Sequence, residues 1–90
     1  MLIEKKIKKL KDLFVELFDN HSFNNSYISI KNSGDEIVLK ANQEGIVLLI
    51  EELIDLCESN IVGKHYHLDE AGIINKCDIP IIISYSNDKL

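Results

Sequence analysis

The sequence predicts an α+β fold in which a helix, a hairpin, a second helix and a second hairpin follow one another. Two stretches repeat apolar residues at the three- and four-residue steps of a helix. Two other regions alternate apolar and polar residues, as half-buried strands do. Because hairpins join the strands, we expect a four-stranded, mostly antiparallel sheet with both helices on one face. The 90 residues fit one domain, residues 1–90.

The first helix is expected over residues 2–19. Its apolar stripe consists of Ile3, Ile7, Leu10, Phe14 and Leu17. Lysines come early on its polar face and acids come late, which opposes the helix dipole. Packing against the rest of the chain must therefore hold this helix, because its intrinsic stability is low.

The first hairpin is expected to have strands over residues 27–31 and 36–41. A two-residue turn at residues 33–34 would place Ile30 opposite Ile37. In that register the apolar residues of both strands share one face, and the polar ones share the other.

The second helix is expected after Asn42, whose side chain can accept a hydrogen bond from a backbone N–H of the first turn. Its buried face is predicted to be Ile46, Leu49, Ile50, Leu53, Ile54 and Cys57. The opposite, solvated face carries an acidic stripe of Glu44, Glu51, Asp55 and Glu58.

The second hairpin is expected to pair residues 65–69 with residues 79–85, and residues 70–78 connect the two strands. Pro80 has no N–H and marks the start or the edge of the last strand. The predicted core of the whole fold is Ile30, Ile37, Leu39, Ile50, Leu53, Tyr66, Leu68 and Ile81.

The net charge of −5 is unevenly distributed. Residues 1–11 carry five lysines and one acid, whereas residues 12–90 carry five lysines and fourteen acids. An acidic body does not favour nucleic acid, because that binding needs lysine and arginine. It attracts a basic protein instead, although solubility alone would also explain an acidic surface.

Neither a membrane span nor a targeting signal is expected. The longest unbroken apolar run is residues 46–50, far below the ~20 residues of a transmembrane helix. Charged residues interrupt the first helix throughout, which is unlike a signal peptide. Cys57, predicted to be buried and inert, and Cys77 have no disulfide-framework spacing. We therefore expect a cytoplasmic protein with reduced thiols and no membrane partner.

Three segments together resemble a known family. Residues 41–45 read Ala-Asn-Gln-Glu-Gly and open the second helix, residues 46–57 form its leucine-rich body, and residues 63–69 read Gly-Lys-His-Tyr-His-Leu-Asp. Their order resembles the thirty-second named family of bacterial polymorphic-toxin immunity proteins, with patterns N-x-E-G-[LI] and G-x-H-x-H-L-D. The resemblance covers residues 37–85, and it departs somewhat just before the last strand. It implies an inhibitor that binds and neutralises a cognate toxin.

His65, His67 and Asp69 share one face of their predicted strand, because side chains alternate along a strand. Two imidazoles with a carboxylate are also ligands that zinc prefers, so a metal site is one interpretation. The other places these residues on a face that meets solvent or a partner. No nucleophile with an adjacent base and no phosphate-binding loop is recognisable, so we expect no catalytic residue and no cofactor.

The leading prediction is an immunity-type protein that binds a toxin without catalysis. A nuclease is a natural example of a basic toxin, because it binds a polyanion. The predicted partner-binding residues are Glu44, Glu51, Asp55, Glu58, His65, His67 and Asp69. Two alternatives remain open. One is a small metal-binding or hydrolytic domain built on His65, His67 and Asp69, and the other is a homodimerising structural module.

Overall fold

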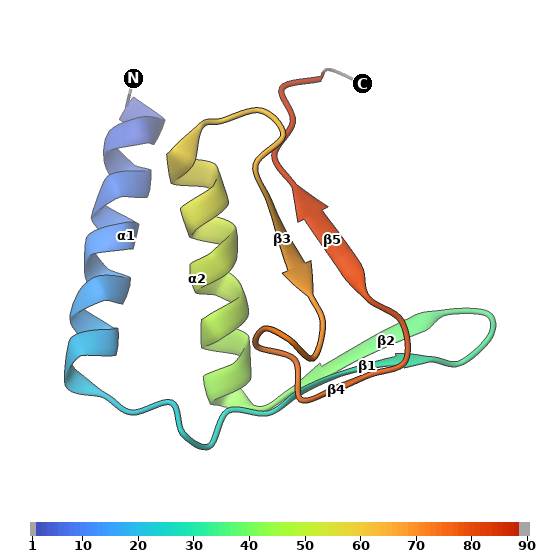
Figure 1. Cartoon of the computed structure of the whole chain (residues 1–90). Coiled ribbons are helices and arrows are strands. Elements are labelled where there is room, and N and C mark those ends of the chain that lie inside the picture. The colour runs from blue at the N-terminus through green and yellow to red at the C-terminus, as the bar shows by residue number, and fades with distance from the viewer. Residues whose placement is uncertain (1, 89–90) are drawn as a thin grey trace.

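The structure is a computed structural model that describes residues 2–88. Its elements are α1 (Leu2–Asn20), β1 (Ile28–Asn32), β2 (Ile37–Ala41), α2 (Gln43–Ser59), β3 (His65–Leu68), β4 (Lys76–Cys77) and β5 (Ile81–Ser84). The molecule is flat, with extents of 42 × 39 × 19 Å. Helix α2 lies between α1 and the strands (Figure 1). The predicted α+β class and the order helix, hairpin, helix, strand pair are confirmed.

The strands form two sheets, so the prediction of one four-stranded sheet is wrong. In the first sheet β1 is the central strand, antiparallel to β2 and parallel to β4. In the second, β3 and β5 form an antiparallel pair. The difference arises in the connection at residues 70–78, which supplies β4. Asn75 exchanges two hydrogen bonds with Ile28, one from each backbone N–H, and this places β4 along β1.

The β1–β2 hairpin is shifted by two residues from the predicted register. Ile30 lies opposite Leu39 and not opposite Ile37. The turn falls one residue later than expected, because the Ser33 N–H donates to the Glu36 carbonyl oxygen at 3.0 Å. Gly34 supplies the left-handed backbone that the turn needs, with φ of 95°. The shift keeps the same residues on each face, since it is an even number.

The core is small and lies between the two sheets. Its fully buried members are Ile28, Ile30, Leu68 and Ile74. The predicted core residues Ile30 and Leu68 are confirmed, and Tyr66 and Ile81 are partly buried. The remaining four predicted core residues are exposed: Ile37, Leu39, Ile50 and Leu53. The first two lie on β2, which is an edge strand, and the others lie on α2.

Helix α2 is turned about its axis relative to the prediction. Gly45 and Leu56 are its buried residues. At Gly45 a Cβ would lie 2.5 Å from the Tyr27 carbonyl oxygen, so only glycine lets the helix approach the start of β1 this closely. Compared with the predicted buried face, the helix is rotated by about 100°, the angle between consecutive helical residues. Ile46, Leu53 and Cys57 are exposed as a result.

Helix α1 agrees with its predicted bounds and lies against α2, which separates it from the strands (Figure 1). The prediction that both helices cover one face of the sheet is therefore wrong. Phe14 and Phe18 are half-buried, and Phe18 also stacks on Phe23 with ring centroids 4.4 Å apart. Among residues 2–88 no helix is long and apolar enough to cross a membrane.

Candidate functional site

A charged network joins α1, α2 and β3 around the carboxylate of Asp55. The Lys11 ammonium on α1 donates to Asp55 Oδ1 at 2.6 Å, and the Lys64 ammonium lies 3.5 Å from Asp55 Oδ2. The Tyr66 hydroxyl on β3 donates to the same Oδ2. Lys11 also reaches Glu51 at 3.4 Å. Two lysines thus face two acids, and the network carries no net charge.

The network shifts the pKa values of its members in the directions that keep it charged and bonded. The pKa of Asp55 falls to about 2, chiefly because Lys11 and then Tyr66 donate hydrogen bonds to its carboxylate. The same bond from the other side raises the pKa of Tyr66 to about 12, and burial adds to it. The pKa of Lys11 is raised, mainly by its hydrogen bond to Asp55. Across neutral pH Asp55 is therefore ionised, and Lys11 and Tyr66 keep their protons.

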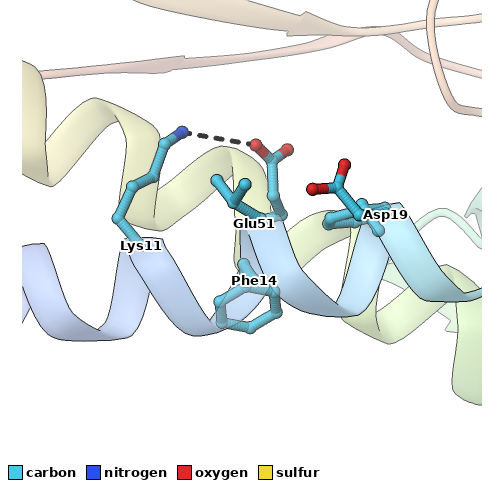
Figure 2. A pocket seen from close by; sticks show the side chains of 6 residues that line it. Lys11, Phe14, Asp19 and Glu51 are labelled. Atoms are coloured by element: carbon cyan, nitrogen blue, oxygen red, sulfur yellow. Dashed lines mark hydrogen bonds and ion pairs between the residues drawn. The ribbon is translucent and has the colours of Figure 1, made fainter.

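A groove runs beside this network between the two helices. Figure 2 shows Lys11 and Glu51 pointing toward each other across it, with the Phe14 ring below them. Val15, Phe18 and Asp19 complete the lining. The groove joins an apolar floor to a charged rim, and the lysine and glutamate of that rim pair with each other.

The acids of α2 do not form the solvated stripe that the sequence predicts. The side chains of Glu51 and Asp55 are 31% and 22% exposed, and both are paired with Lys11. Glu44 is half-buried, and its Oε1 atom is buried without a hydrogen-bond partner. Glu58 is exposed. The same rotation that exposes the apolar residues of α2 has turned Glu44, Glu51 and Asp55 inward, whereas Glu58 stays exposed.

Glu52, an acid of α2 outside the predicted stripe, was expected to be exposed and is also partly buried. Glu52 has a buried Oε2 atom without a hydrogen-bond partner. Its pKa is raised, first by burial and then by repulsion from Glu51. Lys11, Lys64 and Tyr66 were likewise not predicted as members of a network, because their approach to α2 depends on how three elements pack.

The face of β3 that points away from the core carries His65 and His67. Both are exposed, and their rings meet edge to face with centroids 5.0 Å apart. Ile82 lies opposite His67 in the strand pair and is 59% exposed. The His65 Nδ1 atom lies 3.0 Å from the Gly63 carbonyl oxygen. The predicted alternation, with Tyr66 and Leu68 turned inward, is confirmed.

Asp69 has a different role from the two histidines, because its oxygens accept hydrogen bonds within a turn. Its Oδ1 accepts a hydrogen bond from the Ala71 N–H at 3.0 Å, and its carbonyl oxygen accepts from Gly72 and Ile74. It therefore holds the turn after β3. Within residues 2–88 no three His, Cys, Asp or Glu side chains are placed to hold a metal ion. His65 and His67 alone offer two ligands, short of the three or four of a zinc site.

A basic patch lies on the outer face of the three-stranded sheet. Lys40 and Lys76 are both register partners of Ser29, one on each neighbouring strand. Lys31 and Tyr27 line the same depression. The hairpin pattern places Tyr27, Ser29 and Lys40 on one face, but Lys76 joins them only because β4 runs parallel to β1, which was not predicted. No residue spacing along the chain signals that pairing.

The comparison with known families decides where the chain belongs. A family model described as immunity protein 32 matches residues 36–85, more than half of the chain. The chain belongs to the immunity protein 32 family. No curated protein and no solved structure matches it. The family segment runs from the start of β2 to the end of β5, so α1 and β1 precede it.

Within the family segment, the Asn42 side chain stabilises the fold through hydrogen bonds. Its Oδ1 atom accepts hydrogen bonds from the N–H of Gly45 at 2.9 Å and of Tyr27 at 3.0 Å. Its amide donates to the Asn25 carbonyl oxygen at 2.7 Å. The predicted N-cap is confirmed, and the same side chain also ties the helix to the segment before β1.

At the other end of α2, Gly63 has φ of 88°, and its N–H donates to the Tyr85 carbonyl oxygen. This bond extends the β3–β5 pair by one step beyond the strands. Gly63, Leu68 and Asp69 therefore each have a structural reason for their place in the immunity family segment. His65 and His67 are exposed side chains for which the packing gives no such reason.

Proposed function

We propose that this protein is an immunity protein that binds one cognate toxin and neutralises it by covering a surface, without catalysis. Membership of the immunity protein 32 family supports the role. Inhibition by binding requires only a complementary surface, whereas catalysis would need a nucleophile or acid–base pair placed at a substrate. The single observation that carries the choice of surface is the exposed pair His65 and His67 within the family segment.

The proposed contact surface is the outer face of β3 and β5, made by His65, His67, Ile82 and Ser84. Ile82 offers an exposed apolar side chain that a partner can bury. The imidazoles beside it can both donate and accept hydrogen bonds. Side chains of this mixed character are suited to a surface that is exposed before the toxin binds and covered afterwards.

Charge supports a basic partner, although less directly than the sequence suggested. The chain has a net charge of −5, which speeds encounter with a basic surface. Because Lys11 and Lys64 neutralise Glu51 and Asp55, the attraction comes from exposed acids such as Glu58 and Glu70. Of the predicted partner-binding acids we keep Glu58 in that role. Glu44, Glu51, Asp55 and Asp69 would then act by maintaining the fold.

The test uses the toxin encoded next to this gene. A growth assay in which both proteins are produced measures protection, and a titration of the purified proteins measures binding. Replacing His65 and His67 by alanine should weaken toxin binding at least tenfold, equivalent to about 1.4 kcal/mol, and reduce protection. His21→Ala is the matched control, because His21 is the third histidine, is exposed and follows α1. It should bind as the parent does.

Circular dichroism and thermal melting would show that both variants fold like the parent. If the double variant protected cells and bound toxin as well as the parent, the β3–β5 face would be excluded as the contact surface. If the parent itself neither bound nor protected against that toxin, the proposed function would be wrong for this pairing. Rising salt should slow association, since charges beyond ~10 Å are screened at 0.1 M.

A further inference from the structure

One side of α2 carries an apolar stripe that nothing in residues 2–88 covers. Ile46, Ile50 and Leu53 are 48%, 40% and 47% exposed, and Cys57 at the end of the stripe is exposed as well. Their spacing of four, three and four residues places them on one side of the helix. No charged residue of α2 lies on this side, because the acids of α2 lie on the opposite side of the helix, where Glu51 and Asp55 pair with Lys11.

Helix α1 continues this apolar surface. Ile3 and Leu10 are 60% and 46% exposed and lie seven residues apart, so one stands above the other along the helix. Lys11 reaches Asp55 on the side of α2 that faces away from the stripe, so the neighbouring flank of α1, with Leu10, lies on the stripe side. Ile3 and Cys57 line a common depression where the helices end.

The size of this face suits a protein interface. The two helices have 19 and 17 residues, and at a rise of 1.5 Å and a separation of about 10 Å they present roughly 25 by 20 Å. The exposed fractions of the five aliphatic residues together equal nearly two and a half complete side chains. This is the size of the largest apolar patch on a typical single chain, which is often functional, and an interface of about 800 Å² per partner would also include residues around it.

We propose that a second copy of this chain covers the face, so that the helix pair of one copy packs on the helix pair of the other about a two-fold axis. The molecule is only 19 Å thick, and pairing the helices would give a four-helix layer with apolar residues on its inside. The α2 part of the face is uncharged and can pack on its own copy, with Lys6 of α1 at its edge, whereas two copies that each carry −5 would repel through any acidic surface.

We choose a second copy rather than the toxin as the partner of this face, because the face must already be covered in the free protein. An immunity protein is made before it meets its toxin, and an apolar face of this size left open would promote aggregation. The fully buried apolar residues number five in the described chain, which is a small core for stability alone. Dimerisation would bury the stripe in the free protein and would leave the exposed acids on the outside.

Sedimentation velocity and light scattering on the full chain test the proposal directly. At micromolar concentrations the parent should have twice the chain mass of 10.3 kDa. Leu53→Glu should give a monomer with an unchanged circular dichroism spectrum. Val15→Glu is the matched control, because Val15 is 50% exposed but lines the groove beside Lys11 on the other flank of α1. It should remain a dimer.

A second measurement tests the same face without introducing a charged residue into it. In a Cys77→Ser background, Cys57 is the remaining thiol. Its alkylation should be at least tenfold slower in the dimer than after dilution to the monomer. A parent that is monomeric at 100 μM with a freely reactive Cys57 would overturn the proposal. So would a dimer that survives Leu53→Glu and is lost in Val15→Glu. A monomeric parent whose toxin binding is lost in Leu53→Glu would assign the face to the toxin instead.

Discussion

The Lys11 ammonium on α1 lies 2.6 Å from the Asp55 carboxylate on α2, which also accepts the Tyr66 hydroxyl of β3. Helix α1 has no fully buried residue, and α2 lies between it and the strands. The Asp55 carboxylate is therefore a point at which the two helices and the second sheet are tied together. Because the network is neutral and half-buried, we expect it to affect the stability of the fold first.

Replacing Asp55 by asparagine should destabilise the protein. The amide keeps an oxygen for Tyr66 but loses the charge that faces Lys11 and Lys64. Because Asp55 is 22% exposed, the expected loss is about 1–2 kcal/mol, between an exposed and a buried ion pair. Thermal melting should show a drop of roughly 5–15 °C for a chain of this size.

Glu58→Gln is the control for Asp55→Asn, since Glu58 is an exposed acid one turn further along the same helix. It should stay within about 0.5 kcal/mol of the parent. Equal melting temperatures for Asp55→Asn and the parent would show that the network contributes nothing to stability. Charge reversal at Glu51 and Asp55 is expected to damage the fold, and is therefore unsuitable as a test of partner binding.

The stability of the protein should fall at both ends of the pH scale for reasons that trace to this network. The pKa of Asp55 is about 2 in the folded chain and near 3.8 when unperturbed, so its contribution is present above about pH 4 and is lost as pH falls toward 2. The pKa of Tyr66 is about 12 against 10.0, so its contribution is present below about pH 10 and is lost as pH rises toward 12.

Melting temperatures measured from pH 2 to pH 12 on the parent and two variants would separate these contributions. The difference between parent and Asp55→Asn should shrink below pH 4. Tyr66→Phe removes the titrating hydroxyl, so its difference from the parent should shrink above pH 10. Differences that stay constant across the whole range would contradict the assignment of these pKa shifts.

The sequence predicted those features that depend on neighbouring residues. The bounds of α1, the Asn42 cap and the alternation along β3 each rest on contacts or spacings within a few residues. The placement of His65 and His67 on an exposed face could be predicted for the same reason. Their role toward a toxin stays a proposal, because exposure alone does not identify a partner.

The rotation of α2 and the existence of β4 could not be predicted in this way. The apolar residues of α2 recur at helical spacing, and their stripe indicated a buried face. Which side meets the strands is decided instead by Gly45, whose missing side chain admits the Tyr27 carbonyl oxygen. Strand β4 is two residues long, and Asn75 holds it to β1 through contacts 47 positions apart in sequence.

Gly45 gives a direct test of that explanation. In Gly45→Ala the new methyl group would lie 2.5 Å from the Tyr27 carbonyl oxygen and 2.7 Å from Ile28 Cγ1, so α2 or β1 must shift. Overpacking of this kind costs about 1–3 kcal/mol, even though alanine favours helix. Urea unfolding would measure the loss.

Gly72→Ala is the comparison for Gly45→Ala, because a Cβ at Gly72 has its nearest neighbour at 3.4 Å, the edge of ordinary contact. We expect a change of less than about 0.5 kcal/mol there. If Gly45→Ala were as stable as the parent, or more stable, the close approach of α2 to the start of β1 would not determine how the helix is rotated.

Leu56 and Leu53 lie three residues apart on α2 and should respond differently to truncation. Leu56 is 4% exposed, so Leu56→Ala should cost about 2–5 kcal/mol at any protein concentration. Leu53 is 47% exposed within one chain. If a second copy covers it, Leu53→Ala removes contacts only from the dimer. Its melting temperature should then approach that of the parent on dilution, because dissociation makes dimer stability depend on concentration.

Melting curves at 2 μM and 200 μM for the parent and both variants make this comparison. The parent should gain several degrees on concentration, Leu56→Ala should gain as much as the parent from a lower start, and Leu53→Ala should gain less. The reason is that only Leu53 contributes to the association equilibrium, whereas Leu56 contributes to the folding of each chain. Equal concentration dependence in all three would show that Leu53 takes no part in association. A loss of 2–5 kcal/mol for Leu53→Ala that persists on dilution until the chains are separate would instead place Leu53 in the core of the single chain, as the sequence first predicted.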